Sequence, residues 1–190
     1  DKGLSTNIDM RNAYLNFMEK LRELGHKNVG FVTGMDRFRF HCDVRGKLFD
    51  LRGQYGFCED ENLISYNDDY RLSSEERGYL GATNLLSVRN DITAIFAIND
   101  MAALGAMRAI REAGLTVPSD ISVIGCDDIS LAKYACPSLT TVSCQKYEFG
   151  MKIAEKILEC IDRKERGIGE EIATQAFCIY RESLTKVSDL

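Results

Sequence analysis

The stretch that decides the fold runs from Ala94 to Asp128 and reads AIFAINDMAALGAMRAIREAGLTVPSDISVIGCDD. Its first part, Ala94 to Ile98, is a short apolar run rich in β-branched and aromatic residues, which predicts a buried strand. Asp100 can cap a following helix, and Gly114 suits the left-handed position that ends one. Between them, apolar residues recur at helical spacing: Met101, Leu104, Met107, Ala109, Ile110 and Ala113. Ile121 to Gly125 is a second apolar run, so the stretch predicts a strand–helix–strand unit with parallel strands.

Polar and acidic residues follow both strands of this unit. Asn99 and Asp100 come directly after the first strand, and Asp127 and Asp128 follow the second one. The carboxyl ends of parallel strands meet at one edge of a sheet, which is where open α/β sheets bind ligands. We therefore expect a ligand site at this edge.

The rest of the chain alternates between strands and helices in the same way. Ser73-Ser74-Glu75-Glu76 has the form of a capping box, in which Ser and Glu satisfy free backbone N–H groups at a helix start. The alternation predicts an α/β fold with a mostly parallel sheet and helices on both faces. We expect irregular residues at 1–6, loops at 35–43 and 129–138, and a polar tail after Ile179. Helices are expected at 7–24, 44–51, 73–88 and 147–162, and strands at 29–32, 63–66, 140–144 and 172–179.

The composition is that of a soluble globular domain. The chain has 190 residues, of which 45% are hydrophobic and 28% charged. No apolar run approaches the roughly 18 residues needed to span a bilayer, so we expect no membrane partner. The net charge of −5 argues against a basic face that would hold nucleic acid. The first residue is Asp1 rather than Met, so the lack of a visible signal peptide carries little weight.

The cysteine pattern favours reduced thiols over disulfides or metal ligands. There are seven cysteines, an odd number, and no two of them form a CxxC motif. Metal sites need clustered ligands, and only His26 and His41 could add imidazole groups. We therefore expect buried, reduced cysteines in a cytoplasmic protein, with no metal site.

Catalysis is not expected from this sequence. With two histidines in the chain there are few candidate bases, and His26 is expected to cap the end of the first helix. No glycine-rich loop of the GxGxxG or GxxxxGK[ST] type is present. The acidic pairs are adjacent in sequence, and neighbouring side chains in extended chain point apart. We therefore expect no enzyme, no catalytic residues and no cofactor.

The central stretch also resembles the effector-binding domain of the LacI/GalR family of bacterial transcription repressors. The resemblance extends, in the family's order, over nearly the whole chain. It implies a periplasmic-binding-protein-like fold of two lobes, with a ligand in the cleft between them. The residues that carry it are AINDMAALGAMRAIREAGLTVPSDISVIGCDDI at 97–129, PSLTTV at 137–142, Gly150 ahead of an amphipathic helix, and LRELGHKNVGFVTG at 21–34.

The resemblance implies that this fold is incomplete here, because the family's helix-turn-helix headpiece and most of its first lobe have no counterpart in the sequence. Residues 1–6 would lead in from the missing lobe, and residues 7–141 would form the second, C-terminal lobe. Residues 142–180 would hold a helix and a strand that belong mainly to the first lobe. Residues 181–190 would be a tail.

Asp127 and Arg45 are the leading candidates for ligand-binding residues. A carboxylate accepts two hydroxyl protons and a guanidinium donates to two oxygens, so such a pair can grip neighbouring hydroxyls of a polyol. Asp127 follows a strand end, and the resemblance makes it an effector ligand, with Cys126 in place of the family's aromatic residue. The alternative role for Asp127 is to cap a loop, and Asp128 is expected to cap the following turn.

The resemblance places Arg45 at the family's arginine position, although Leu48 stands where the family has glycine. Under a shifted register, Arg39 or Lys47 could serve instead of Arg45. Arg45 could also be a solvated helix charge.

Four further residues are candidates by resemblance. Asn99 matches the family's asparagine after the strand, and its alternative role is a helix-start cap. Tyr70 takes the place of an aromatic residue near the ligand, with Phe38 and Phe40 as alternatives. At the later lobe crossing, Cys144 occupies the family's glutamine position by counting, and Gln145 follows it.

The sequence therefore predicts the effector-sensing domain of a LacI/GalR-like repressor that binds a small polar ligand, such as a sugar or a nucleoside-like molecule. The expected partners are that effector and a second copy in a homodimer, whereas DNA would be bound only through a headpiece absent from this chain. The alternatives are a sugar-binding protein of a transporter, or a sensor lobe of another signalling protein, because these share the fold.

Overall fold

A six-stranded sheet forms the centre of the computed structural model, which describes residues 4–163 and 170–187, without the side chains of Cys42, Val44, Arg45 and Leu48. The strand order is β3-β2-β4-β5-β6-β8. Neighbours from β3 to β6 pair in parallel, whereas β8 pairs antiparallel with β6, so the predicted α/β fold is confirmed. The strands are β2 (Val29–Val32), β3 (Ile64–Ser65), β4 (Ala94–Ala97), β5 (Ser122–Cys126), β6 (Thr140–Ser143) and β8 (Phe177–Ile179).

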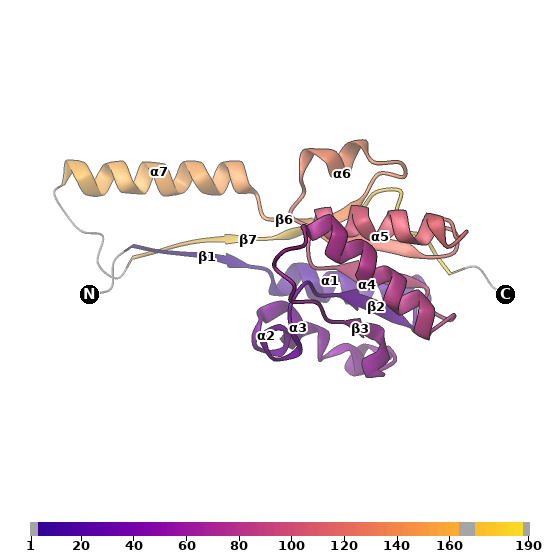
Figure 1. Cartoon of the computed structure of the whole chain (residues 1–190). Helices are drawn as coiled ribbons and strands as arrows, with labels where there is room; N and C mark the ends of the chain where they lie inside the picture. Colours follow the sequence, from indigo (N-terminus) through magenta and orange to yellow (C-terminus); the bar gives the residue numbers. More distant parts are fainter. Residues whose placement is uncertain (1–3, 164–169, 188–190) are drawn as a thin grey trace.

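Helices cover both faces of this sheet (Figure 1). On one face, Phe31 of β2 stacks on its register partner Phe96 of β4, with ring centroids 5.2 Å apart. Residues of α1, α2 and α3 complete this aromatic core: Tyr14, Phe17, Phe40 and Phe49. Helices α4 and α5 lie on the other face. Gly30, the residue before Phe31, points to that face and lies against Leu85 of α4. The bounds are α1 (Arg11–Glu23), α2 (Arg37–Cys42), α3 (Val44–Phe49), α4 (Ser74–Val88), α5 (Asp100–Glu112) and α6 (Ser130–Tyr134).

An arm projects from the carboxyl edge of the sheet (Figure 1). It consists of a separate two-stranded parallel sheet, β1 (Ser5–Asp9) with β7 (Glu171–Gln175), and of the long helix α7 (Lys146–Asp162). The apolar stripe of α7 is largely exposed, and Leu158 and Ile161 are 60% and 63% accessible. An apolar stripe of this kind normally packs against another element. The described residues supply no such surface along most of α7.

The structure corrects several expected boundaries. The helix expected from Asn7 starts only at Arg11, because Asn7 to Asp9 pair with Ala173 to Gln175 in the arm. For the same reason, residues 5 and 6 of the expected lead-in are strand. The strand expected at 172–179 is two strands in different sheets, divided at Ala176.

Two expected loops contain short helices. α2 lies within 35–43, where the Asp36 side chain accepts a hydrogen bond from the Arg39 N–H, and α6 lies within 129–138. Two 3₁₀ turns, η1 (Arg52–Tyr55) and η2 (Glu61–Leu63), complete the fold, and the capping box of Ser73 and Glu76 is present as predicted.

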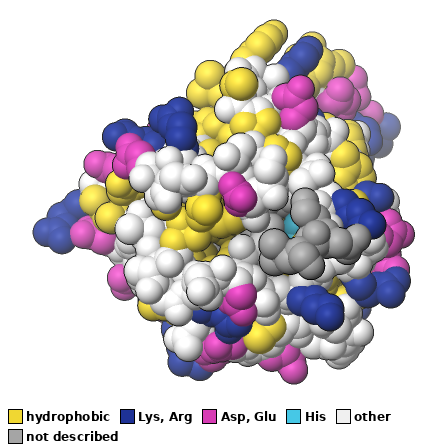
Figure 2. Space-filling view, turned by 90° about the vertical axis from the view of Figure 1, so that its right-hand side faces the viewer, with side chains coloured by type: hydrophobic (Ala, Val, Ile, Leu, Met, Phe, Trp, Pro, Cys, Tyr) yellow, Lys and Arg dark blue, Asp and Glu magenta, His cyan; other side chains and the backbone are white. Residues whose placement is uncertain are grey.

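The segment from Arg181 to Val187 is not the free polar tail that the sequence predicts. Ser183 is fully buried, and its hydroxyl donates to the Val123 carbonyl at 2.6 Å. The Val123 N–H donates to the Ser183 carbonyl at 2.8 Å, so the segment is bonded to β5. The Val187 N–H also donates to the Leu24 carbonyl at the end of α1. This segment lies at the end of the lobe opposite the arm, where hydrophobic side chains gather among charged ones (Figure 2).

His26 anchors the same segment instead of capping α1. Its ring nitrogens lie 3.0 Å from the Thr93 hydroxyl and 3.0 Å from the Thr185 carbonyl oxygen. Burial lowers the pKa of His26 below its ordinary value of 6.5, because a desolvated imidazolium is disfavoured. The expected cap by a positively charged ring is therefore wrong.

This burial predicts a loss of stability in mild acid. The folded state binds the His26 proton more weakly than the unfolded state does, so the free energy of unfolding should fall as the pH drops below 6.5. Urea unfolding of the wild type and of His26→Gln between about pH 5 and 7.5 measures the difference. The His26→Gln protein should lose this part of the pH dependence. An unchanged pH dependence in the variant would contradict the prediction.

Candidate functional site

Three predicted site residues lie at the carboxyl edge of the main sheet. Asn99 follows β4, Asp127 follows β5, and Gln145 comes two residues after β6. These strands are neighbours in the sheet, in the order β4-β5-β6, so the edge brings together residues that are far apart in sequence. The arm leaves from this same edge (Figure 1).

The backbone at Asp127 and Asp128 is strained. Their φ angles are 119° and 49°, in the region that favours glycine. Such conformations cost about 1–3 kcal/mol each and cluster at ligand sites, where the surrounding structure holds them. Here the Asp127 N–H donates to the Val142 carbonyl of β6 at 2.9 Å, and the Asp127 side chain is half-buried. This bond fixes the Asp127 backbone just past the end of β5.

Asp128 has a structural partner. Its carboxylate accepts a hydrogen bond from Arg181 Nη2 at 2.7 Å, and Arg181 Nη1 donates to the Leu139 carbonyl at 2.7 Å. The expectation that Asp128 caps the following turn is wrong, because Ile129 is the N-cap of α6 and no side chain caps it. Asp128 instead joins the strand end to the final segment of the chain.

Asp100 lies beneath the same edge with 0% exposure. Its two oxygens accept hydrogen bonds from the Thr141 hydroxyl at 2.5 Å and from the Ile129 N–H at 2.8 Å. Burial raises the pKa of Asp100, and the charges of Asp127 and Asp128 raise it further. The Ile129 bond holds the far end of the short loop that carries Asp127, and the Thr141 bond ties Asp100 to the neighbouring strand β6, so Asp100 positions that loop.

Asn99, not Asp100, caps α5. The Asn99 side-chain oxygen accepts a hydrogen bond from the Ala102 N–H at 2.8 Å, and its amide nitrogen lies 3.4 Å from the Ser74 hydroxyl. The predicted cap by Asp100 is wrong because the chain turns into the helix one residue earlier. Asn99 also lines a pocket of about 240 Å³ between the ends of β2 and β4 and the start of α4.

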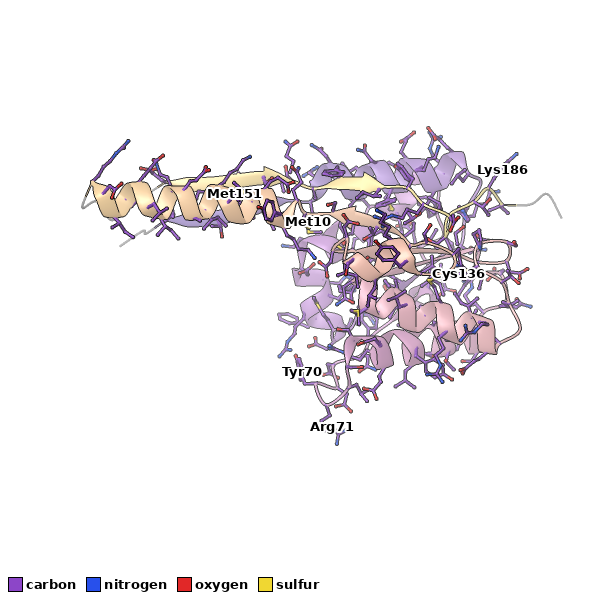
Figure 3. The ribbon with its side chains drawn as sticks, turned by 90° about the horizontal axis from the view of Figure 1, so that it is seen from above. Met10, Tyr70, Arg71, Cys136, Met151 and Lys186 are labelled. Carbon is purple, nitrogen blue, oxygen red and sulfur yellow. The ribbon has the colours of Figure 1, made fainter. Side chains whose placement is uncertain are left out.

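Two of the three aromatic candidates are exposed, and the third is buried. Phe38, on α2, is 77% exposed, and Tyr70, in the loop before α4, is 66% exposed. The Arg39 guanidinium lies 5.3 Å from the centre of the Tyr70 ring. Tyr70 lies at the rim of the lobe, away from the arm residue Met151 (Figure 3). Phe40 is fully buried in the aromatic core, so it cannot contact a ligand in the cleft.

The remaining candidates are Gln145 and the basic residues. Gln145 has a left-handed backbone, with φ of 47°, and its side-chain nitrogen donates to the Gln175 carbonyl at 2.9 Å. It therefore ties the start of α7 to the end of β7. Arg45 falls on α3, but its side chain lies outside the described residues. Arg39 pairs with Asp36 at 3.2 Å, and Lys47 is exposed.

Sequence reasoning missed three residues of this edge: Thr141, Arg181 and Arg77. Thr141 donates a hydrogen bond to Asp100, which lies 41 positions away along the chain. Arg181 donates to Asp128, which lies 53 positions away. Arg77 lines the pocket beside Asn99. No local pattern marks these contacts, because each of them joins separate segments.

The structure also bears on the expectations about metal sites, membrane spans and cysteines. Within residues 4–163 and 170–187, no cluster of His, Cys, Asp and Glu side chains could hold a metal ion. In the same residues, no helix has the length and apolar character needed to cross a bilayer. Of the six cysteines whose side chains the structure describes, Cys126 and Cys144 are buried, Cys136 is exposed, and the other three are half-buried. The expectation of generally buried thiols therefore holds for only part of the set.

Comparisons with known proteins place this fold among ligand-binding domains. A family model described as a periplasmic binding protein-like domain matches residues 18–184. The chain is 32% identical over 168 residues to the ribose operon repressor of Haemophilus influenzae, covering 86% of this chain and 48% of that protein. It is 30% identical over 169 residues to the transcriptional repressor CytR of Escherichia coli, covering 88% and 48%.

Solved structures agree with these matches. A LacI family transcriptional regulator from Enterococcus faecium, with bound ribose, superposes with a TM-score of 0.78 at 25% identity. The superposition covers 96% of this chain and 66% of that one. The chain thus spans about half the length of the curated relatives it matches.

Proposed function

We propose that this chain is the effector-sensing part of a LacI-family repressor. The premise is that the chain belongs to the periplasmic binding protein-like domain family and has LacI-family repressors among its relatives. The effector is a small polar molecule, a sugar or a related polyol. The observation that carries the proposal is Asp127, held in a strained left-handed conformation at the carboxyl edge of a parallel sheet. In this proposal the chain is not an enzyme, and it works in the bacterial cytoplasm.

The chemistry of the edge suits hydroxyl groups. A half-buried carboxylate can accept two hydroxyl protons, so Asp127 can hold two neighbouring hydroxyls of one ring. Asn99 adds an amide group at the end of the neighbouring strand β4, although its side-chain oxygen already accepts a hydrogen bond from the Ala102 N–H. Arg45 would donate to ring oxygens, and Tyr70, Phe38 and Gln145 are the further candidates at the rim. The solved structure of a LacI family transcriptional regulator with bound ribose supports this ligand class.

The second part of the proposal concerns the missing lobe. The two-stranded sheet of β1 and β7 is separate from the main sheet, and much of the apolar face of α7 is exposed. We assign residues 10–143 and 177–187 to one lobe, and the arm to the other lobe. Further chain would complete that other lobe and close the cleft over Asp127. This differs from the sequence-based division, which assigned residues 142–180 mainly to the other lobe.

Control of transcription would follow from lobe movement. An effector that binds one arrangement of the two lobes better than another shifts the population toward that arrangement. DNA binding would require a headpiece, which this acidic chain does not supply. The repressor relatives favour this function over a transporter's sugar-binding protein.

A ligand screen tests the proposal. The protein should carry both lobes, because half of a cleft lacks half of its contacts. Thermal-shift screening of sugars and nucleosides is expected to identify a stabilising effector, and calorimetric titration then gives its dissociation constant. If no sugar, polyol or nucleoside stabilises the two-lobed protein, the proposed ligand class is wrong.

We also predict that the effector domain forms a homodimer. An open pocket of about 420 Å³ lies beside α5, where Arg108 and Arg111 accompany hydrophobic side chains: Leu104, Met107, Leu115, Val117 and Pro137. Nearby on α6, Leu131 and Tyr134 are exposed. Exposed apolar surface of this kind is typical of protein interfaces. Light scattering of the two-lobed protein should give the dimer mass, and a monomer at high micromolar concentration would contradict the prediction.

A further inference from the structure

The pocket lined by Asn99 opens at the carboxyl edge beside the Asp127 loop. It has a volume of about 240 Å³ and lies where β2 and β4 end and α4 and α5 begin. Its polar lining comes from Thr33, Ser74, Arg77 and Asn99, and the backbone of Gly34 also faces it. Asn99 follows β4, and Asp127 follows the neighbouring strand β5, so the pocket adjoins the proposed effector site.

Arg77 brings a positive charge and an unpartnered donor to this pocket. Its Nη1 donates to the Gly34 carbonyl at 3.1 Å. Its Nε–H is buried and has no hydrogen-bond partner among the described residues. Within the same residues, no carboxylate lies within ion-pair distance of Arg77. The pKa of Asp69 is lowered by its hydrogen bonds from Arg71 and, at longer range, by the charge of Arg77. Buried donors are normally paired, so a ligand group is the expected partner of the Arg77 Nε–H.

The surroundings of Arg77 add positive potential. The N-terminal ends of α4 and α5 both meet the pocket, and helix N-termini favour anions. The nearby carboxylates are held by other partners. Glu76 accepts a hydrogen bond from the Ser73 N–H, Asp69 is paired with Arg71, and Asp100 accepts from Thr141 and Ile129. None of these three carboxylates makes a hydrogen bond or ion pair to Arg77.

We propose that this pocket is a subsite for an anionic group of the effector, a phosphate or a carboxylate, held by Arg77, Ser74 and Asn99. The inference rests on the proposed function, because it assigns the effector to polyols that carry one negative group. A guanidinium donates to two oxygens of such a group in a fixed geometry, and the Ser74 hydroxyl and the Asn99 amide supply further donors.

The test uses inorganic phosphate and acetate as probes of the 190-residue chain. Each salt is titrated against chloride at constant ionic strength, and ¹⁵N NMR follows the backbone of Gly34, Ser74 and Asn99 and the Nε–H of Arg77. We expect saturable shifts at these residues, with phosphate, acetate or both. Saturation by phosphate alone identifies a phosphoryl site, and saturation by acetate alone identifies a carboxylate site.

Two variants separate the charge from the shape of the pocket. Arg77→Met keeps the aliphatic stem and should weaken anion binding by about tenfold or more, because it removes a charge-assisted hydrogen bond. Arg77→Lys keeps the charge and should retain part of the binding. Arg22→Met is the matched control, since Arg22 is exposed on α1 and pairs with Glu19. The control should bind the anion like the wild type.

Absence of saturation with both anions overturns the subsite, and so does undiminished binding by Arg77→Met. These results can be distinguished from failure of the proposed function. If the two-lobed protein binds a neutral sugar while this chain binds neither anion, only the subsite is wrong. Anion binding without any sugar or polyol binding would instead contradict the proposed function.

Discussion

Replacing Asp127 with alanine is expected to weaken effector binding by about 10- to 150-fold, the effect of losing about 1.5–3 kcal/mol from a charged hydrogen-bond partner. The carboxylate projects from a strained strand end that Asp100 holds through Thr141 and Ile129. Removal of the carboxylate leaves the effector hydroxyls without acceptors in a cleft from which water is excluded. Calorimetric titration of the two-lobed protein, with the effector from the thermal-shift screen, measures the loss.

Asp128→Ala is the matched control for Asp127→Ala. Asp128 is ion-paired with Arg181, so its replacement should lower the free energy of unfolding by about 1–3 kcal/mol by leaving the guanidinium with one partner fewer. Effector affinity should change little, because Asp128 faces the final segment of the chain. If Asp127→Ala binds the effector like the wild type while Asp128→Ala does not, the ligand-binding role belongs to Asp128.

Gly78→Ala should destabilise the lobe by about 3 kcal/mol or more, near the upper end for over-packed cores. Helices α4 and α5 approach so closely that a Cβ at Gly78 would overlap the Ala102 carbonyl, and one at Gly105 would overlap the Glu75 carbonyl. The clashing atoms belong to helix backbones, which cannot move aside as a flexible side chain could. For a chain of this size the melting temperature should fall by about 6–12 °C, as circular dichroism can measure.

Gly150→Ala provides the comparison within the same chain. Gly150 lies in α7, and a Cβ there would meet nothing within 4 Å. Because alanine favours helices over glycine by about 1 kcal/mol, this variant should melt at the same temperature as the wild type or slightly higher. Equal melting temperatures for Gly78→Ala and the wild type would show that the two helices can separate at little cost.

The sequence by itself determined the features that depend on neighbouring residues. The apolar runs at Ala94 and Ile121 and the helical spacing between them specified a strand–helix–strand unit, because side-chain periodicity follows backbone geometry. The capping box at Ser73 was also readable, since its two hydrogen bonds span three residues. The position of Asp127 at the carboxyl edge of the sheet, where open α/β sheets bind ligands, followed from parallel strands alone.

Only the tertiary structure decided the features that depend on contacts between distant segments. Nothing in residues 171–179 indicates that one half pairs with β1 and the other half with β6. The polar composition of Arg181 to Val187 is typical of a free tail. In the structure, however, Ser183 and Thr185 form hydrogen bonds with β5. In the same way, Asp100 and Arg77 gain their roles from Thr141 and Gly34, which local patterns cannot pair with them. Buried polar groups must find partners wherever the fold places them, and the identity of those partners is therefore a property of the folded chain.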